Sequence, residues 1–314
     1  MSRSILVTGA TGKQGGALIK HLISQSNTHT NKYTILAVTR NVNSTGAQKL
    51  QSLSKSIKLV QGDLDSPSDL FKAAAKVSPN NKIWGVFSVQ TVSLRENDTN
   101  TSTEVKQGKG LIDEALKYNV EHFVYSSVDR GGEERSWNNP TPVPHFKTKH
   151  LIEEHLRDST RGTNMGWTIL RPVIFMENLV PGFGGKVFLT ALRDTMGSKT
   201  MGWISTYDIG FFAAQAFIHS DSQRYNGRAL SLAGEEFSWE EMNEKFKLAT
   251  GKRVPTTFSF LGSALKVGVK EMGVMLDWFR DDGYKANVKE LREINPDMLD
   301  LETWLKTRSE FVKR

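Results

Sequence analysis

The segment Gly9-Ala-Thr-Gly12-Lys-Gln-Gly15 has the glycine spacing of loops that hold the pyrophosphate of a dinucleotide. Glycines allow the tight turn, and the N-terminus of the following helix offers N–H groups and partial positive charge to the phosphates. A strand pattern over Ser4 to Thr8 precedes the loop, and an amphipathic helix pattern over Gly16 to Ser24 follows it. We therefore expect these loop residues to contact a dinucleotide: Gly9, Thr11, Gly12, Lys13, Gln14 and Gly15.

The end of the second predicted strand, Ala37-Val-Thr-Arg40, indicates which dinucleotide the loop holds. Sites that prefer NAD place a carboxylate here, where it accepts hydrogen bonds from the ribose 2′-hydroxyl. A guanidinium suits a 2′-phosphate instead, and no Asp or Glu precedes Asp63 to repel it. We expect NADP(H), contacted by Thr39 and Arg40; the alternative is a solvated arginine that begins a loop.

Asp63 and Leu64 end the third predicted strand, in the sequence Gln61-Gly-Asp-Leu. At that place they would lie near the adenine edge of the cofactor. The alternative for Asp63 is an N-cap role in a helix that begins over residues 63–68. Both residues are assigned to the cofactor site, and the sequence leaves the two roles of Asp63 open.

The charge of the chain is unevenly distributed. The formal net charge is +7, and the first 62 residues hold eight Lys or Arg and no Asp or Glu, so this segment accounts for the excess. The cations stand singly, without interleaved aromatic residues, so we expect a polyphosphate ligand and no direct nucleic-acid binding. The absence of cysteine excludes disulfides, thiolate metal sites and thiol nucleophiles.

Strand and helix patterns alternate along the first half of the chain. This alternation predicts an α/β fold of the Rossmann type, a doubly wound parallel sheet with helices on both faces. The predicted strands cover Ser4 to Thr8, Tyr33 to Thr39, Ile57 to Val60, Ile83 to Val89, His122 to Ser126 and Trp167 to Leu170. We place the NADP(H)-binding domain at residues 1–180 and a smaller, mostly helical but mixed α/β lobe at 181–314, with an approximate boundary across which elements can interleave. The lobe has predicted helices near Val187 to Arg193, Asp208 to Ile218 and Trp239 to Thr250 and a strand at Ala229 to Leu232.

Several loops and the chain start carry further expectations. Asn27 to Lys32 is polar and predicts a solvent loop, whereas Arg130 to Pro144 follows the fifth strand and is a candidate wall of a substrate pocket. No apolar run approaches the roughly 18 residues of a membrane span, so no membrane association is expected. The start of the chain leaves no room for a signal peptide before the first strand, which predicts a cytoplasmic protein and leaves a nuclear location open.

Taken together, several short motifs resemble those of the NmrA-like branch of the atypical short-chain dehydrogenase/reductases. The motifs are Val7-Thr-Gly-Ala-Thr-Gly12, Val38-Thr-Arg-Asn41, Gly62-Asp-Leu64, Gly85-Val-Phe87, Glu104-Val-Lys-Gln-Gly-Lys109, His145-Phe-Lys-Thr-Lys149, Arg171-Pro172 and Phe175-Met-Glu-Asn178. The resemblance implies a Rossmann cofactor site. It leaves activity open, because several members of the branch act as redox sensors that bind a dinucleotide and a regulatory partner. It also implies cofactor contacts from Lys149, Val89, Pro172 and Phe175.

The catalytic residues depart from the usual short-chain pattern. Typical members use Tyr-x-x-x-Lys, in which the tyrosine donates a proton and the lysine lowers its pKa and holds the nicotinamide ribose. None of the six tyrosines has a lysine four residues on, and the corresponding stretch keeps Lys149 with His145 in place of tyrosine. His145 can donate a proton near neutral pH, or it is a polar residue at the start of a helix.

Two serines and two further histidines complete the candidate set. Ser126 and Ser127 end the fifth strand, where the family would place a hydroxyl that orients the substrate; an ordinary strand end is the alternative. His145, His150 and His155 recur every five residues, which places them on different sides of a helix, so no metal site is predicted.

Two functions remain from the sequence. One is an NADPH-dependent reductase that passes hydride to a small carbonyl or conjugated substrate, with catalytic roles for His145, Lys149 and Ser127. The other is an NADP(H)-responsive regulator that binds a protein partner. Loss of the tyrosine favours the regulator, and the Arg130 to Pro144 loop, together with the aromatic residues after Pro172, favours a closed substrate pocket.

Overall fold

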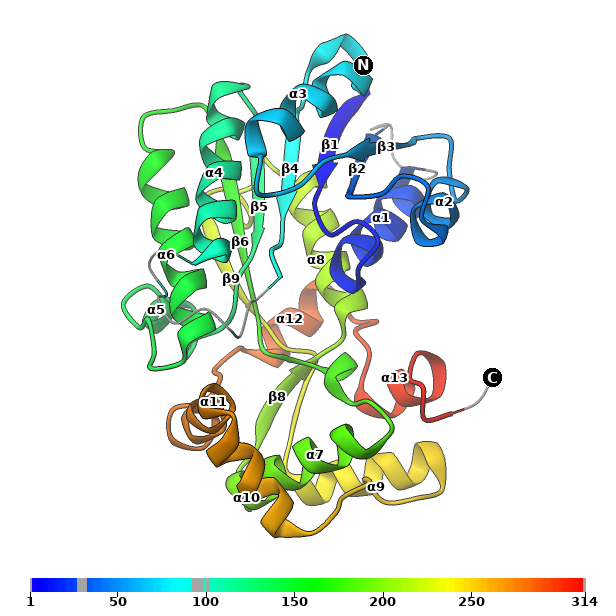
Figure 1. Cartoon of the computed structure of the whole chain (residues 1–314), viewed down its shortest axis with the longest axis vertical. Coiled ribbons are helices and arrows are strands. Elements are labelled where there is room, and N and C mark those ends of the chain that lie inside the picture. The colour runs from blue at the N-terminus through cyan, green and yellow to red at the C-terminus, as the bar shows by residue number, and fades with distance from the viewer. Residues whose placement is uncertain (1, 27–32, 92–98, 100–101, 313–314) are drawn as a thin grey trace. The chain divides into compact units, whose positions relative to one another are not determined.

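The computed structural model describes residues 2–26, 33–91, 99 and 102–312 (Figure 1). The loop predicted over residues 27–32 lies outside the described residues. A seven-stranded sheet has the order β3-β2-β1-β4-β5-β6-β9. Its strands are β1 (Arg3–Val7), β2 (Tyr33–Thr39), β3 (Ile57–Gln61), β4 (Gly85–Ser88), β5 (His122–Ser126), β6 (Gly166–Pro172) and β9 (Arg228–Leu232). The pairings among β1 to β6 are parallel.

Helices cover both faces of this sheet, as the doubly wound prediction requires (Figure 1). One face carries α1 (Lys13–Ser26), α2 (Thr45–Gln51) and α8 (Thr206–Ile218), and the other carries α3 (Pro67–Val77), α4 (Thr103–Lys117) and α6 (Pro144–Ser159). The helices of each group pack closely. A Cβ atom at Gly210 of α8 would lie 2.6 Å from Ala17 of α1, and one at Gly108 of α4 would lie 2.5 Å from Ile152 of α6. Because both faces are covered, strands such as β2 and β5 are buried along nearly their whole length.

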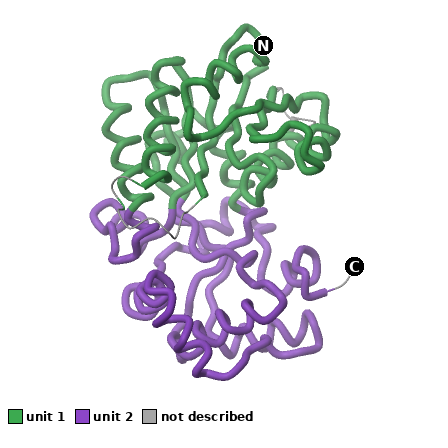
Figure 2. Tube along the Cα trace, in the orientation of Figure 1, with its two compact units in different colours: residues 1–127, 148–170, 209–230 green, residues 128–147, 171–208, 231–314 purple. Residues whose placement is uncertain are grey.

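Contacts divide the chain into two interleaved units (Figure 2). Unit 1 consists of residues 1–127, 148–170 and 209–230, and unit 2 consists of residues 128–147, 171–208 and 231–314. The chain passes repeatedly from one unit to the other, so the two units interleave on both sides of residue 180.

Unit 2 is a smaller mixed α/β unit with its own sheet and core. Its sheet joins β7 (Ile174–Phe175) in parallel and β10 (Glu235–Phe237) antiparallel to the central β8 (Met201–Ile204). The core is rich in aromatic and sulfur-containing side chains, among them Trp203, Phe237 and Trp304. Its helices are α5 (Glu133–Ser136), α7 (Phe183–Met196), α9 (Trp239–Thr250), α10 (Ser259–Gly268), α11 (Lys270–Asp281), α12 (Val288–Ile294) and α13 (Leu301–Thr307).

The structure corrects two sequence-based placements. The strand predicted at 229–232 is β9, the last strand in the order of the seven-stranded sheet. The helix predicted at 208–218 is α8, which packs on α1. Both segments were expected in the smaller lobe. The sequence could not predict these placements, because β9 pairs with β6 and α8 packs on α1, and both contacts join residues that are far apart in sequence. Among the described residues, no helix combines the length and the apolar character needed to cross a membrane.

Candidate dinucleotide site

The glycine loop is a compact turn between β1 and α1. Gly9 has a φ of +57°, and the N–H groups of Gly12 and Gly16 donate to the carbonyls of Gly9 (2.9 Å) and Gly12 (3.0 Å). A Cβ atom at Gly15 would lie 2.4 Å from the Gly9 carbonyl oxygen, so α1 can approach the loop this closely only with glycine there. An added Cβ at Gly12 would lie 3.1 Å from the Gly9 carbonyl oxygen, and apart from Gly9 and the chain neighbours no described residue comes within 4 Å of it, so the outer side of the loop is open beyond this contact.

The ends of β1 and β4 are held together beside this loop. The hydroxyl of Thr8 donates to the carbonyl of Val89 (3.1 Å) and accepts from its N–H (2.8 Å). A Cβ atom at Gly9 would lie 2.9 Å from a methyl carbon of Val89. Val89, assigned to the cofactor from the sequence, therefore lies next to the glycine loop.

A hydrogen bond joins the first turn of α1 to the end of β5. The hydroxyl of Ser126 donates to the side-chain oxygen of Gln14 at 2.6 Å. Ser126 and Ser127 are both buried, and the N–H of Ser127 donates to the carbonyl of Leu170 on β6. The serine that the structure links to the glycine loop is thus Ser126, whereas the sequence assigned the catalytic role to Ser127.

Arg40 and Asp63 lie at the same edge of the sheet as the loop. Thr39 pairs with Gln61 across β2 and β3, so the residues that follow both strands emerge side by side. Arg40 is exposed, and no described residue forms a hydrogen bond or ion pair with its guanidinium. Asp63 accepts from the N–H of Asp65 (3.1 Å) and closes a turn. It is not an N-cap, because α3 begins at Pro67 and its N-cap residue is Ser66.

Lys149 takes part in a buried polar cluster within unit 1. Its Nζ donates to Glu104 Oε1 at 2.9 Å, and the hydroxyl of Thr148 donates to the other carboxylate oxygen. The side chains of Lys149 and Glu104 are 11% and 3% exposed, so the pair is shielded from water. Glu104 belongs to a motif that the sequence analysis noticed, but nothing in the sequence indicated its partner.

His145 lies one turn before Lys149 on α6 and has a partner of its own. Its Nδ1 lies 2.6 Å from Glu271 Oε1, and its backbone N–H donates to the same oxygen at 3.2 Å. The hydrogen bond from His145 lowers the pKa of the Glu271 carboxyl. A carboxylate on Nδ1 fixes the orientation of the ring, an arrangement found in proton-donating histidines and in purely structural ones.

The remaining predicted residues lie in unit 2. Pro172 ends β6 and accepts a hydrogen bond from the N–H of Asp129 (3.1 Å), and Phe175 is half-buried on β7. The Arg130 to Pro144 segment is less irregular than its composition indicates. The buried Arg130 guanidinium donates to two carbonyls of the segment, those of Ser136 and Asn139, and to the carbonyl of Val128 just before it.

Comparison with known proteins places the chain in a family. The model of the NmrA-like family matches residues 1–308. An NmrA-like family domain-containing oxidoreductase of Aspergillus hancockii is 26% identical over 268 residues, which cover 80% of this chain and 74% of the relative.

Two solved proteins have the same fold. The negative transcriptional regulator NmrA, in complexes with NAD and with NADP, gives TM-scores of 0.70 and 0.66 at 19% identity, over 98% of this chain and 95% of that one. The triphenylmethane reductase of Citrobacter sp., complexed with NADP(H), gives 0.69 at 18% identity, over 98% and 99% of the two chains. Because the family model spans nearly the whole sequence, the chain belongs to the NmrA-like family.

Proposed function

We propose that the chain binds NADP(H) at the glycine loop, with the 2′-phosphate at Arg40. The observation that carries this proposal is the exposed Arg40 guanidinium, which has no partner among the described residues and follows β2 at the sheet edge of the glycine loop, in a segment of 62 residues without a carboxylate. The loop fits a pyrophosphate, because its open side at Gly12 would be filled by any side chain. NmrA binds both NAD and NADP according to the complexes above, so Arg40 is the feature that distinguishes the two in this chain.

We further propose that the chain is a reductase for a small carbonyl or conjugated substrate. NADPH supplies a hydride with its electron pair to the electrophilic carbon, and a proton must reach the oxygen or the carbanion carbon. Lys149, held by Glu104, donates to the nicotinamide ribose. His145, held by Glu271, is the candidate proton donor, and a serine at the end of β5 orients the substrate. The curated relative is itself called an oxidoreductase, which supports this assignment.

A second candidate is an NADP(H)-responsive regulator that acts through a protein partner. The absence of Tyr-x-x-x-Lys favours it, as does the likeness in fold to the negative transcriptional regulator NmrA. Both candidates require the same cofactor site. They differ in whether a bound NADPH is consumed.

Two measurements test these proposals in order. Calorimetry with NADPH, NADP, NADH and NAD should give tighter binding of the two phosphorylated forms; equal affinities would contradict the Arg40 assignment. Steady-state oxidation of NADPH is then followed against a panel of aldehydes, ketones, enones and quinones. Turnover with a panel member supports the reductase, whereas tight NADPH binding without turnover on any member favours the regulator.

A further inference from the structure

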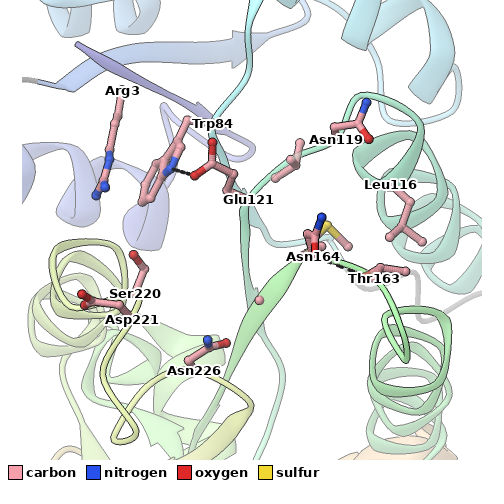
Figure 3. Close-up of a pocket in the computed structure, with 13 residues that line it drawn as sticks. Arg3, Trp84, Leu116, Asn119, Glu121, Thr163, Asn164, Ser220, Asp221 and Asn226 are labelled. Atoms are coloured by element: carbon pink, nitrogen blue, oxygen red, sulfur yellow. Dashed lines mark hydrogen bonds between the residues drawn. The ribbon is translucent and has the colours of Figure 1, made fainter. Parts of the chain in front are cut away.

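A groove of about 840 Å³ lies in unit 1 at the edge of the large sheet where the strands begin (Figure 3). Arg3 is the first residue of β1, Glu121 immediately precedes β5, and Gly166 is the first residue of β6. The glycine loop follows the other end of β1, so this amino-edge groove and the dinucleotide site occupy opposite edges of one sheet. The volume is within the range of small-molecule sites, roughly 300–1,000 Å³.

Three side-chain amides from separate segments line the amino-edge groove. Asn119 follows α4, Asn164 precedes β6 and Asn226 precedes β9, and Figure 3 shows the three around one opening. No described residue forms a hydrogen bond with any of these amide groups. Each amide offers donors and an acceptor, so together they can satisfy a ligand that both donates and accepts.

The charges of the groove are few and nearly balanced. Glu121 is occupied, because its carboxylate accepts from Lys82 Nζ (2.7 Å) and Trp84 Nε1 (2.9 Å). The Arg3 guanidinium lies over the Trp84 ring, 4.3 Å from its centre. Asp221 has no hydrogen-bond partner among the described residues. Lys82 thus offsets Glu121, and Arg3 and Asp221 balance each other, so the groove has no excess positive charge to attract a phosphorylated or carboxylated ligand.

A buried histidine adds an acceptor below the groove. The hydroxyl of Thr168 donates its one hydrogen to the carbonyl of Tyr225 (2.7 Å), so the His122 Nε2, 3.0 Å away, must donate to Thr168. His122 Nδ1 is then without a proton. A Cβ atom at the groove residue Gly166 would lie 3.1 Å from this nitrogen and 2.5 Å from Asn226 Oδ1, so only a glycine there leaves the Asn226 amide in its place at the groove.

We propose that the amino-edge groove binds a neutral polyhydroxy compound of the size of a monosaccharide or cyclitol. Hydroxyl groups both donate and accept, as the amides of Asn119, Asn164 and Asn226 require. The side chains of Leu116 and Met165 supply apolar surface for the C–H groups of such a ring. The proposal does not depend on the dinucleotide site.

The test uses the full chain and four probes: D-glucose, D-galactose, D-ribose and myo-inositol. Binding is measured by saturation-transfer difference NMR and calorimetry, and at least one probe should bind. The variants Asn226→Ala and Asn164→Ala each remove a groove amide and should weaken that binding about tenfold.

The matched control is Gln223→Ala, which removes an exposed amide from the same loop as Asn226 but outside the groove. It should bind the probe as the parent does, and saturating NADPH should leave the affinity unchanged because the two sites lie on opposite edges. Glucose 6-phosphate should bind more weakly than glucose. If no probe binds, or if both asparagine variants, folded by circular dichroism, bind as tightly as the parent, the proposal is wrong.

Discussion

Lys149 and Glu104 form a buried ion pair, with Nζ 2.9 Å from Oε1 and the second carboxylate oxygen occupied by the Thr148 hydroxyl. The carboxylate uses one of the three hydrogens of the ammonium group and leaves two for other acceptors. The pair joins the first turn of α4 to α6. Loss of either partner would leave the other charge buried without compensation, which costs more than the pair contributes when intact.

Glu104→Gln should therefore destabilise the protein strongly. The expected loss is about 3–5 kcal/mol in the free energy of unfolding, measured by urea denaturation. NADPH affinity should fall as well, because Lys149 loses the carboxylate that holds its ammonium group in place.

The matched control is Asp113→Asn on the same helix. The side chain of Asp113 is 50% exposed and pairs with His155, so the expected loss is at most about 1 kcal/mol. In a Lys149→Met background, Glu104→Gln should cost much less than in the parent. Additive losses in this double-mutant cycle would show that the two residues do not interact.

Arg40→Ala should remove the preference for NADP(H) over NAD(H). The expected loss of NADPH affinity corresponds to about 1–3 kcal/mol, the range for a hydrogen bond to a charged group, with little change for NADH. Calorimetry measures both. Arg224→Ala, another exposed arginine of unit 1, serves as control and should change neither affinity. An equal loss of affinity for NADPH and NADH would show that Arg40 does not contact the 2′-phosphate.

Two glycines of the loop should respond in opposite ways to substitution. Gly12→Val should retain the fold and lose cofactor binding, because the added atoms project from the open side of the loop. Gly15→Ala should destabilise the protein, since its Cβ would lie 2.4 Å from the Gly9 carbonyl oxygen. Fluorescence of bound NADPH and thermal melting separate the two effects, and the exposed Gly184→Val is the control. Unchanged NADPH binding by a folded Gly12→Val protein would rule out this loop as the phosphate site.

His145→Phe tests the proton donor. If the chain is a reductase, turnover should fall by about 10² to 10⁴, with cofactor affinity nearly unchanged, because the residue acts on the substrate. Lys149→Met should lower both. His155→Phe on the same helix removes a histidine that pairs with Asp113 and should leave turnover as it is. Undiminished turnover in His145→Phe would show that another group donates the proton.

His122 should make the protein sensitive to acid. Burial lowers the pKa of His122 from 6.5 to about 4. Between these two pH values, His122 is protonated in the unfolded chain but neutral in the folded chain. The stabilisation is complete above pH 6.5 and is lost as the pH falls toward 4, by about 3 kcal/mol in total.

His122→Gln should therefore lose less stability than the parent between pH 7 and pH 4.5, measured by urea unfolding at each pH. Asp208 acts in the opposite sense, because burial raises the pKa of its carboxyl from 3.8 to about 6 and its folded form gains relative stability on acidification. Asp208→Asn should accordingly steepen the acid loss. Parallel stability profiles for the parent and His122→Gln would mean that His122 does not titrate in this range.

The dinucleotide loop and the alternating sheet could be predicted because their signals are local. The glycines, the apolar strand and the amphipathic helix all lie within residues 4–24, and the apolar strands occupy continuous short runs. The helix at Trp239–Thr250 was predicted at its observed bounds, and its capping box, Ser238 with Glu241, is a signal of the same local kind.

The polar partners could not be predicted, because each joins residues far apart in sequence. Glu104 and Lys149 are separated by 45 positions, and His145 and Glu271 by 126. The link from Ser126 to Gln14 also spans 112 positions, so nothing local favoured Ser126 over its neighbour Ser127. The groove at the start of the strands was missed for the same reason, since its asparagines lie in three separate connections.

The interleaving of the two units limits the order in which the polypeptide can fold as it leaves the ribosome. Unit 1 begins at the N-terminus but needs residues 209–230, and its edge strand β9 ends at Leu232. At about 5–20 residues per second, the roughly 56 residues from the end of β6 at Pro172 to the start of β9 at Arg228 take about 3 to 11 seconds to synthesise. During this interval the edge of β6 that later pairs with β9 is unpaired. We therefore expect chaperones to bind nascent chains that stall shortly before residue 228.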